Sequence, residues 1–481
     1  MLMLCWGAFL STSADAKQLD SRPNVLMIAV DDLNHWVRHL NRNTQVKTPN
    51  IDGLAAKGMS FHRAYAPSAI CNATRASMLT GMRPSTTGIY RNSIDWRSVV
   101  GDGYTLPGFF KEHGYYVAGG GKLFHKHTII RKSDWHEYYS RKGKRYPPEK
   151  RGKIKGRTIR YKAGNMPISE IAAEDDNQSD YHVAQWAVSQ VEKKHDKPFF
   201  IAAGIFRPHL PWSVPKKYFE LYPEEDIQLP PYKEDDLNDL PYHVEDAPEH
   251  AKVLKEGSWK KAIRAYMASV TFADRQVGRI LDALEKGPNK DNTIIVLWGD
   301  HGWHLGEKHR WRKSALWEEA TRTPYIWYVP GLTKAGSKTD TPVDTQSLWS
   351  TLAALLDLPL PSHVEGENIL PLLKNPNAKW SVPAITTYHF NNHAIRSKEF
   401  RYISYDKGGK ELYDHRVDPY EWTNLALNDK YKDTIKSLDR WIPKANRGAE
   451  EAREMFGGET KYLGTSKKKD TKPVTDHDFE G

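Results

Sequence analysis

Polar side chains that could bind a cation follow two apolar runs of strand length. Asp31 and Asp32 come directly after the run 24–30, and Asp300 and His301 come shortly after the run 292–298. Neither run alternates polar with apolar residues, which is typical of strands buried on both faces of an α/β sheet. Such sheets place their ligands just past the carboxyl ends of the strands. The sequence therefore predicts that these four side chains share one site.

Three carboxylates and one imidazole form an oxygen-rich set of donors. Adjacent aspartates in a regular strand face opposite sides, but a chain that turns at the strand end lets both reach one ion. Such donors suit a hard divalent cation, Ca²⁺ or Mg²⁺, better than Zn²⁺ with its nitrogen and sulfur ligands. An aspartate doublet alone is more often a solvated surface feature, so the prediction depends on the second strand end.

Cys71 is the one cysteine expected in the mature chain, because Cys5 lies in an apolar N-terminal segment that cleavage after Ala16 would remove. Residues 71–75 read Cys-Asn-Ala-Thr-Arg, and Leu-Thr-Gly follows at 79–81. A lone cysteine forms no intrachain disulfide. Cys71 is therefore a buried apolar thiol, a reactive group or a modification site.

Further basic side chains follow predicted strands in the same manner. They are Lys122 and His125 in Gly-Lys-Leu-Phe-His at 121–125, His209 in Arg-Pro-His-Leu-Pro at 207–211, and Lys313 at the end of His-Arg-Trp-Arg-Lys at 309–313. The prolines beside His209 restrict its backbone. Taken singly, each is an ordinary solvated lysine or structural histidine, so a catalytic role rests on their joint occurrence.

Together these segments resemble the motifs of type I, formylglycine-dependent sulfatases, and most closely those of iduronate-2-sulfatases. The motifs are Cys-x-Ala-x-Arg with Leu-Thr-Gly, Gly-Lys-x-x-His, Arg-Pro-His-Leu-Pro, and Asp-His-Gly-Trp-His-Leu-Gly-Glu at 300–307. They occur in family order over residues 23–425. Ala73 and Thr74 stand where many sulfatases have Pro and Ser. His301 stands where many sulfatases have Asn, and in this the chain resembles the iduronate-2-sulfatases.

The resemblance implies that Cys71 is oxidised to formylglycine, whose aldehyde hydrate takes sulfate from an ester. It implies catalytic roles for Cys71, Arg75, Lys122, His125, His209 and Lys313. It implies one Ca²⁺, with Mg²⁺ as the alternative, held by Asp31, Asp32, Cys71 as formylglycine, Asp300 and His301.

The resemblance also assigns a role to each basic group. Lys122 and Lys313 would bind sulfate oxygens, and Arg75 would hold the hydrate together with the cation. His209 would protonate the departing oxygen. His125 would take the remaining hydroxyl proton so that sulfate leaves and the aldehyde returns. Ester cleavage needs this neutralised charge, positioned nucleophile and proton donor.

The predicted fold is α/β and, by the resemblance, alkaline-phosphatase-like. A large, mostly parallel or mixed central sheet is flanked by helices, and a smaller C-terminal antiparallel sheet follows. Further strands are expected at 115–118, 198–203 and 325–329, helices at 51–57, 181–194 and 259–286, and short strands at 384–387, 394–396, 400–405 and 411–413. We divide the chain into a catalytic domain at 22–380, a C-terminal subdomain at 381–463 and a disordered tail at 464–481.

The N-terminus has the features of an export signal. A short apolar run is followed by Ala14-x-Ala16, so we expect a signal peptide at 1–16 and a secreted or periplasmic protein. No apolar run approaches the length of a membrane span. The resemblance implies a maturation partner, either a formylglycine-generating enzyme or an anaerobic sulfatase-maturating enzyme.

The formal net charge of +10 favours acidic partners. No nucleic-acid-binding motif is present, so we expect a sulfated glycan, most closely a uronate 2-O-sulfate by the resemblance. Another sulfated sugar or choline sulfate remains open as the substrate. Two other functions also remain: a phosphatase or phosphodiesterase of the same superfamily, which would use Ser or Thr and two zinc ions, and a non-catalytic glycan binder.

Overall fold

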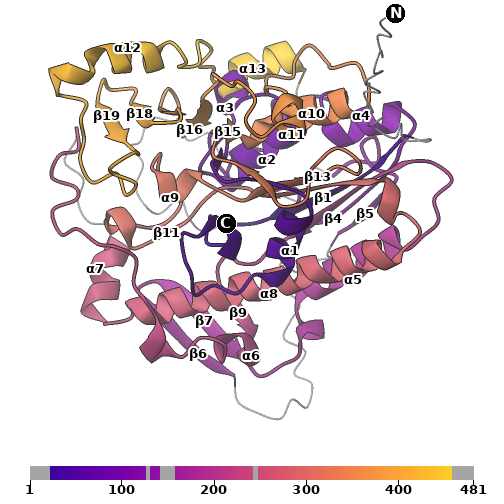
Figure 1. Ribbon diagram of the computed structural model, residues 1–481, viewed down its shortest axis with the longest axis horizontal. Coiled ribbons are helices and arrows are strands. Elements are labelled where there is room, and N and C mark those ends of the chain that lie inside the picture. Colours follow the sequence, from indigo (N-terminus) through magenta and orange to yellow (C-terminus); the bar gives the residue numbers. More distant parts are fainter. Residues whose placement is uncertain (1–21, 126–129, 141–157, 242–247, 458–481) are drawn as a thin grey trace, which may run out of the picture.

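The computed structural model describes residues 22–125, 130–140, 158–241 and 248–457 (Figure 1). The predicted signal peptide and the C-terminal tail lie outside these ranges. Within them, a central sheet of eight strands organises the molecule, in the order β14-β2-β13-β10-β1-β8-β4-β5. Its strands are β1 (Asn24–Val30), β2 (Met59–Phe61), β4 (Tyr116–Gly121), β5 (Glu137–Tyr139), β8 (Phe199–Ile205), β10 (Thr293–Gly299), β13 (Tyr325–Tyr328) and β14 (Ser337–Thr339).

The sheet is mixed, as predicted. β1 runs parallel to β8 and β10, whereas β13 runs antiparallel to β10. The register pairs Val30 with Gly299, so the chain leaves β1 and β10 at the same sheet edge. This pairing brings Asp31 and Asp300 to one place.

Both faces of the sheet are buried, which explains the unbroken apolar runs. Leu26, Ile28 and Val30 of β1 pack in one core cluster, and Val25 and Met27 pack in another on the opposite face. Figure 1 shows the long helix α8 (Trp259–Lys286) along one face with α1 (Pro49–Lys57) and α5 (Ser179–Val191). The other face carries α2 (Cys71–Thr80), α4 (Leu106–Glu112), α10 (Leu348–Leu355) and α11 (Leu370–Lys374). None of the described helices is long and apolar enough to cross a bilayer.

A small antiparallel sheet follows near the C-terminus, also as predicted. Its strands are β16 (Ala384–Thr387), β17 (His393–Arg396), β18 (Phe400–Ser404) and β19 (Lys410–Asp414), each paired with the next. The helix α12 (Lys432–Asp439) packs on β18, and α13 (Ala449–Phe456) returns to the short helix α3 (Pro84–Thr87). The domain boundary at Trp380 stays a prediction.

Three smaller sheets and short helices complete the described fold. The sheets pair β6 (Ile159–Ala163) with β7 (Met166–Ile171) and β9 (Trp212–Pro215), β11 (His304–Leu305) with β12 (Trp311–Arg312), and β3 (Ala64–Tyr65) with β15 (Val343–Asp344). The remaining α-helices are α6 (Lys216–Phe219), α7 (Pro248–Lys255) and α9 (Glu318–Thr321).

A buried ionic network joins α9 to the C-terminal sheet. Glu318 is 3% exposed and accepts from the guanidinium groups of Arg396 and Arg401. Arg401 also pairs with Glu421, whose other carboxylate oxygen accepts the backbone N–H of Glu318 at 2.8 Å. His415 lies 2.9 Å from Glu421. Each charge therefore has a partner although none reaches solvent, and removal of one leaves the others uncompensated.

We expect Glu318→Gln to lower the free energy of unfolding by about 3 kcal/mol, because two buried arginines lose a shared counter-charge. Urea unfolding followed by tryptophan fluorescence measures the change. Glu399→Gln is the control, since Glu399 pairs with Arg416 while both side chains are 52% exposed, and such pairs contribute little. Equal effects of the two substitutions would contradict this role of the network.

Candidate active site

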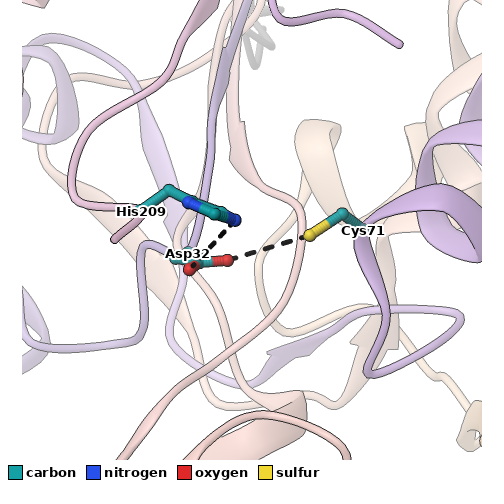
Figure 2. Close-up of side chains that lie close together, drawn as sticks. All are labelled: Asp32, Cys71 and His209. Carbon is teal, nitrogen blue, oxygen red and sulfur yellow. Dashed lines mark hydrogen bonds and ion pairs between the residues drawn. The ribbon is translucent and has the colours of Figure 1, made fainter. Parts of the chain in front are cut away.

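Cys71 lies at the first position of α2 and is fully buried. Its Sγ is 3.2 Å from Nε2 of His301 and 3.9 Å from Oδ1 of Asp32. Figure 2 shows that Cys71 and His209 both lie near the Asp32 carboxylate, Cys71 near Oδ1 and His209 near Oδ2. A helix N-terminus carries partial positive charge, which favours a negative atom at this position.

Asp31 and Asp32 both face the site because the backbone turns between them. Asp32 has a positive φ of 57°, and its N–H donates to Oδ1 of Asp300 at 2.9 Å. The N–H of Asp31 continues the strand ladder to the carbonyl of Ile205 at 3.0 Å. This left-handed residue is the turn that the aspartate doublet required.

Arg75 lies one helical turn after Cys71 and connects the two strand ends. Its Nη2 donates to Oδ1 of Asp31 at 3.0 Å, and its Nε donates to Oδ2 of Asp300 at 3.1 Å. It also donates to the carbonyl of Lys122. The guanidinium is 1% exposed, so these contacts fix the carboxylates and leave it no route to bulk water.

Two lysines approach the carboxylates from different loops. Lys122 Nζ pairs with Asp31 and lies 4.8 Å from the ring centroid of Phe206. Lys313 Nζ donates to Oδ1 of Asp32 at 2.8 Å and lies 4.9 Å from the ring centroid of Trp303. The aromatic faces hold the ammonium groups in place without consuming their hydrogen bonds.

Gly121 gives Lys122 its position. Its φ is +75°, and a Cβ there would lie 2.1 Å from the carbonyl oxygen of Gly204 in β8. Only glycine therefore fits this turn at the end of β4.

Three histidines surround the same centre. The Nδ1–H of His301 donates to the carbonyl of Gly302 at 2.9 Å, so Nε2 is the ring nitrogen that faces Sγ. His209 holds Nε2 at 3.9 Å from Oδ2 of Asp32, and its Nδ1 lies 2.6 Å from the carbonyl of Leu210. His125 is hydrogen-bonded to Cys71.

The electrostatic field at Sγ is positive. Burial raises the pKa of the Cys71 thiol, but the positive charges of Lys313, Lys122 and His301 together lower it by more. This pKa therefore lies well below its ordinary value. Burial lowers the pKa of His125, because it disfavours the charged imidazolium. The site therefore stabilises negative charge beside residue 71.

The acidic residues fit a hard divalent cation. Carboxylate oxygens of Asp31, Asp32 and Asp300 lie within 4.8 Å of one another, and ligand atoms of Cys71, Asp300 and His301 form a second such group. Oδ2 of Asp32 is buried and accepts no hydrogen bond from any described residue. A cation held by the three carboxylates would satisfy this oxygen.

The fold thus gathers every predicted site residue around one centre, and their individual roles remain proposals. Sequence reasoning missed Phe206 and Trp303, which lie beneath the two lysines. Both residues stand inside or beside the quoted motifs, at 207–211 and 300–307. Their position next to the motifs was the available signal. A contact between an aromatic ring and a lysine of another loop leaves no periodic pattern in the sequence, so these contacts were not predicted.

This combination of a mixed α/β sheet with a cationic, carboxylate-rich centre at a helix N-terminus defines a hydrolase of anionic esters. The Sulfatase family model matches residues 23–358, and a model described as N-sulphoglucosamine sulphohydrolase, C-terminal, matches 299–447. The chain therefore belongs to the sulfatase family and is a sulfuric ester hydrolase, as its motifs predicted.

Named relatives agree with this assignment. A sulfatase of Formosa agariphila is 41% identical over 89% of this chain and 88% of its own. Iduronate 2-sulfatase of Mus musculus is 33% identical over 73% of this chain and 72% of its own. The phosphonate monoester hydrolase of Agrobacterium radiobacter has the same fold, with a TM-score of 0.71, 20% identity and coverage of 90% and 96% of the two chains.

Proposed function

We propose that the protein hydrolyses sulfate esters of carbohydrates, with a uronate 2-O-sulfate as its substrate. The observation that carries the hydrolysis is the convergence of Arg75, Lys122 and Lys313 on carboxylates beside residue 71. The 33% identity to a mouse iduronate 2-sulfatase supports the uronate, as does the net charge of +10. Secretion or periplasmic export and maturation by a formylglycine-generating or anaerobic sulfatase-maturating enzyme belong to the same proposal.

In this mechanism, formylglycine at position 71 would supply a hydrated aldehyde as nucleophile. A Ca²⁺ ion held by Asp31, Asp32, Asp300, His301 and residue 71 would supply fixed positive charge beside it. Arg75 keeps two of these carboxylates in place through its paired hydrogen bonds.

The remaining groups act on the sulfate and on protons. The ammonium groups of Lys122 and Lys313 neutralise sulfate oxygens as charge develops on them. The side chain of His209 is 20% exposed, more than those of Lys122 and Lys313, and its Nε2 is the group that would give a proton to the departing sugar oxygen. His125 is bonded to residue 71 and is placed to take a proton from it.

The loop that begins at Tyr90 joins the neighbour of residue 71 to the C-terminal sheet. The side chain of Asn72 donates to the carbonyls of Arg91 at 2.9 Å and Ile94 at 2.8 Å, which fixes that loop next to the nucleophile. Tyr90 begins the loop and packs edge to face on Phe390 of the β16–β17 turn, with 6.2 Å between centroids. Phe390 is 47% exposed. The exposed ring of Phe390 supports a sugar substrate, because aromatic rings pack well on the apolar faces of sugars.

The substrate assignment is tested with a panel of sulfate esters. We expect kcat/KM for sulfated uronate oligosaccharides to exceed that for neutral sulfated sugars, because basic groups outside the sulfate pocket attract the carboxylate. Added salt should narrow the difference by screening these charges. Faster turnover of choline sulfate, aryl sulfates or sulfated galactose than of every sulfated uronate would overturn the assignment and leave the sulfatase function intact.

A second test concerns Phe390. Phe390→Ala is expected to raise KM for a sulfated oligosaccharide about fivefold, which is the loss of one ring contact, with little change in kcat. Steady-state kinetics on the oligosaccharide measure both constants. Leu427→Ala is the control, since Leu427 is 93% exposed and far more open than Phe390. Similar KM values for the two variants would exclude Phe390 from substrate contact.

A further inference from the structure

A cavity of about 570 Å³ lies beside the edge strand β14, where the large sheet meets the C-terminal sheet. Three segments that are distant in the sequence line it: 338–342, 376–383 and 397–398. None of the active-site residues contributes to its wall. The cavity is therefore a separate feature of the surface.

The cavity is positively charged. Lys338, Lys379 and Lys398 line it, are exposed, and form no ion pair with any described residue. Asp340 is the single acidic residue of the wall, so three ammonium groups face one carboxylate. Three unpaired ammonium groups around one hollow favour a ligand with several negative charges.

The rest of the wall suits a carbohydrate. Trp380 is half-buried, and its Nε1–H is shielded from solvent without a hydrogen-bond partner among the described residues. Proline rings at 376 and 383 continue the apolar surface, and Thr341 and Ser381 add hydroxyl groups. An indole face, hydroxyl groups and cations together match the ring faces, hydroxyls and sulfates of a sulfated sugar.

The cavity also lies at the edge of the sheet that carries the active site. β13 runs antiparallel to β10 and to β2, and β14 runs parallel to β2. β14 therefore points in the same direction as β10, so Thr339 and Asp300 leave the sheet at the same edge. Three strand spacings of about 4.8 Å separate β14 from β10, which is about 14 Å along the sheet.

We propose that this cavity is a second, non-catalytic binding site for a sulfated polysaccharide. The class of glycan rests on the proposed function, whereas the binding itself needs no catalysis. A chain held at the cavity would present its other sulfate groups near the active-site edge of the sheet. The effective concentration of these sulfate esters at the active site would rise. The cavity should therefore increase kcat/KM for a polymer more than for a small ester.

The test is direct binding of heparin, a sulfated uronate polymer, to the whole protein. The cavity variant combines Lys338→Ser, Lys379→Ser and Lys398→Ser. In native gels with increasing amounts of immobilised heparin, we expect its affinity for heparin to be about tenfold lower than that of the wild type. The control combines Lys194→Ser, Lys255→Ser and Lys286→Ser. These exposed lysines lie on other elements and pair with no acidic group in the described part of the chain, so the same charge is removed. Circular dichroism confirms that each variant is folded.

The outcomes are distinct. Weaker heparin binding by the cavity variant, retained binding by the control, and a fall in kcat/KM for the polymer relative to 4-nitrocatechol sulfate would support the site. Equal weakening in both variants would show attraction by net charge alone and overturn it, as would no heparin binding by the wild type. Failure of the uronate assignment would instead appear in the substrate panel, with heparin binding unchanged.

Discussion

Cys71→Ser is expected to give a folded protein whose sulfatase activity is lower by at least about a thousandfold. Serine is close to cysteine in size and keeps a polar atom at the start of α2, so the buried helix should pack as before. In a cell that converts only cysteine, however, the hydroxyl never becomes an aldehyde. Turnover of 4-nitrocatechol sulfate and the thermal unfolding midpoint measure the two effects separately.

Met78→Leu is the matched control, because Met78 is equally buried on α2 and a swap of similar volume is tolerated. Mass spectrometry of the peptide around position 71 provides an independent readout. The wild-type peptide should be lighter than the encoded one by the difference between SH₂ and O. Ordinary turnover by Cys71→Ser, or an active wild type with unmodified cysteine, would eliminate the formylglycine mechanism.

Asp300→Asn is expected to lower Ca²⁺ affinity and activity together, each by at least about a hundredfold. Both oxygens of Asp300 are already engaged, one with the N–H of Asp32 and one with Arg75. The amide can keep one of these acceptor positions but carries no charge, so the cation loses a ligand and Arg75 loses a partner. The measurement is the rise in unfolding temperature when Ca²⁺ is returned to chelated protein.

Wild-type protein should show this rise and Asp300→Asn should not. The control is Asp291→Asn, which changes an exposed carboxylate before β10 and should behave as the wild type. Full activity of the wild type after exhaustive chelation would rule out a required cation. A normal Ca²⁺ response in Asp300→Asn would remove that residue from the ligand set.

Local patterns in the sequence determined most of the secondary structure that positions the site. The unbroken apolar runs marked β1 and β10 because burial on both faces requires apolar residues at every position. The helix predicted at 259–286 has the same bounds in the structure, since its period of apolar residues continues over 28 positions. The motifs also supplied the candidate residues, because these segments are short and continuous.

Some boundaries depended on neighbours that a local pattern does not contain. The strand predicted at 115–118 is β4, which extends to Gly121 although glycine is rare in strands. Trp135 and Trp186 lie against Gly119 and Gly120, where a Cβ would come within 2.6 Å of their rings. The helix predicted to reach Lys194 ends at Val191, where the buried face of α5 also ends.

The arrangement of charge was decided only by the tertiary structure. Asp32 turns into the left-handed region because its N–H meets Asp300, a residue far away in the sequence. Lys313 reaches the same aspartate from another loop, and Arg401 reaches Glu318 from the C-terminal sheet. The basic cavity likewise exists only because three separate segments meet. Sequence periodicity records which face of an element is buried, whereas pairing of charges depends on which elements become neighbours, and long-range packing fixes that choice.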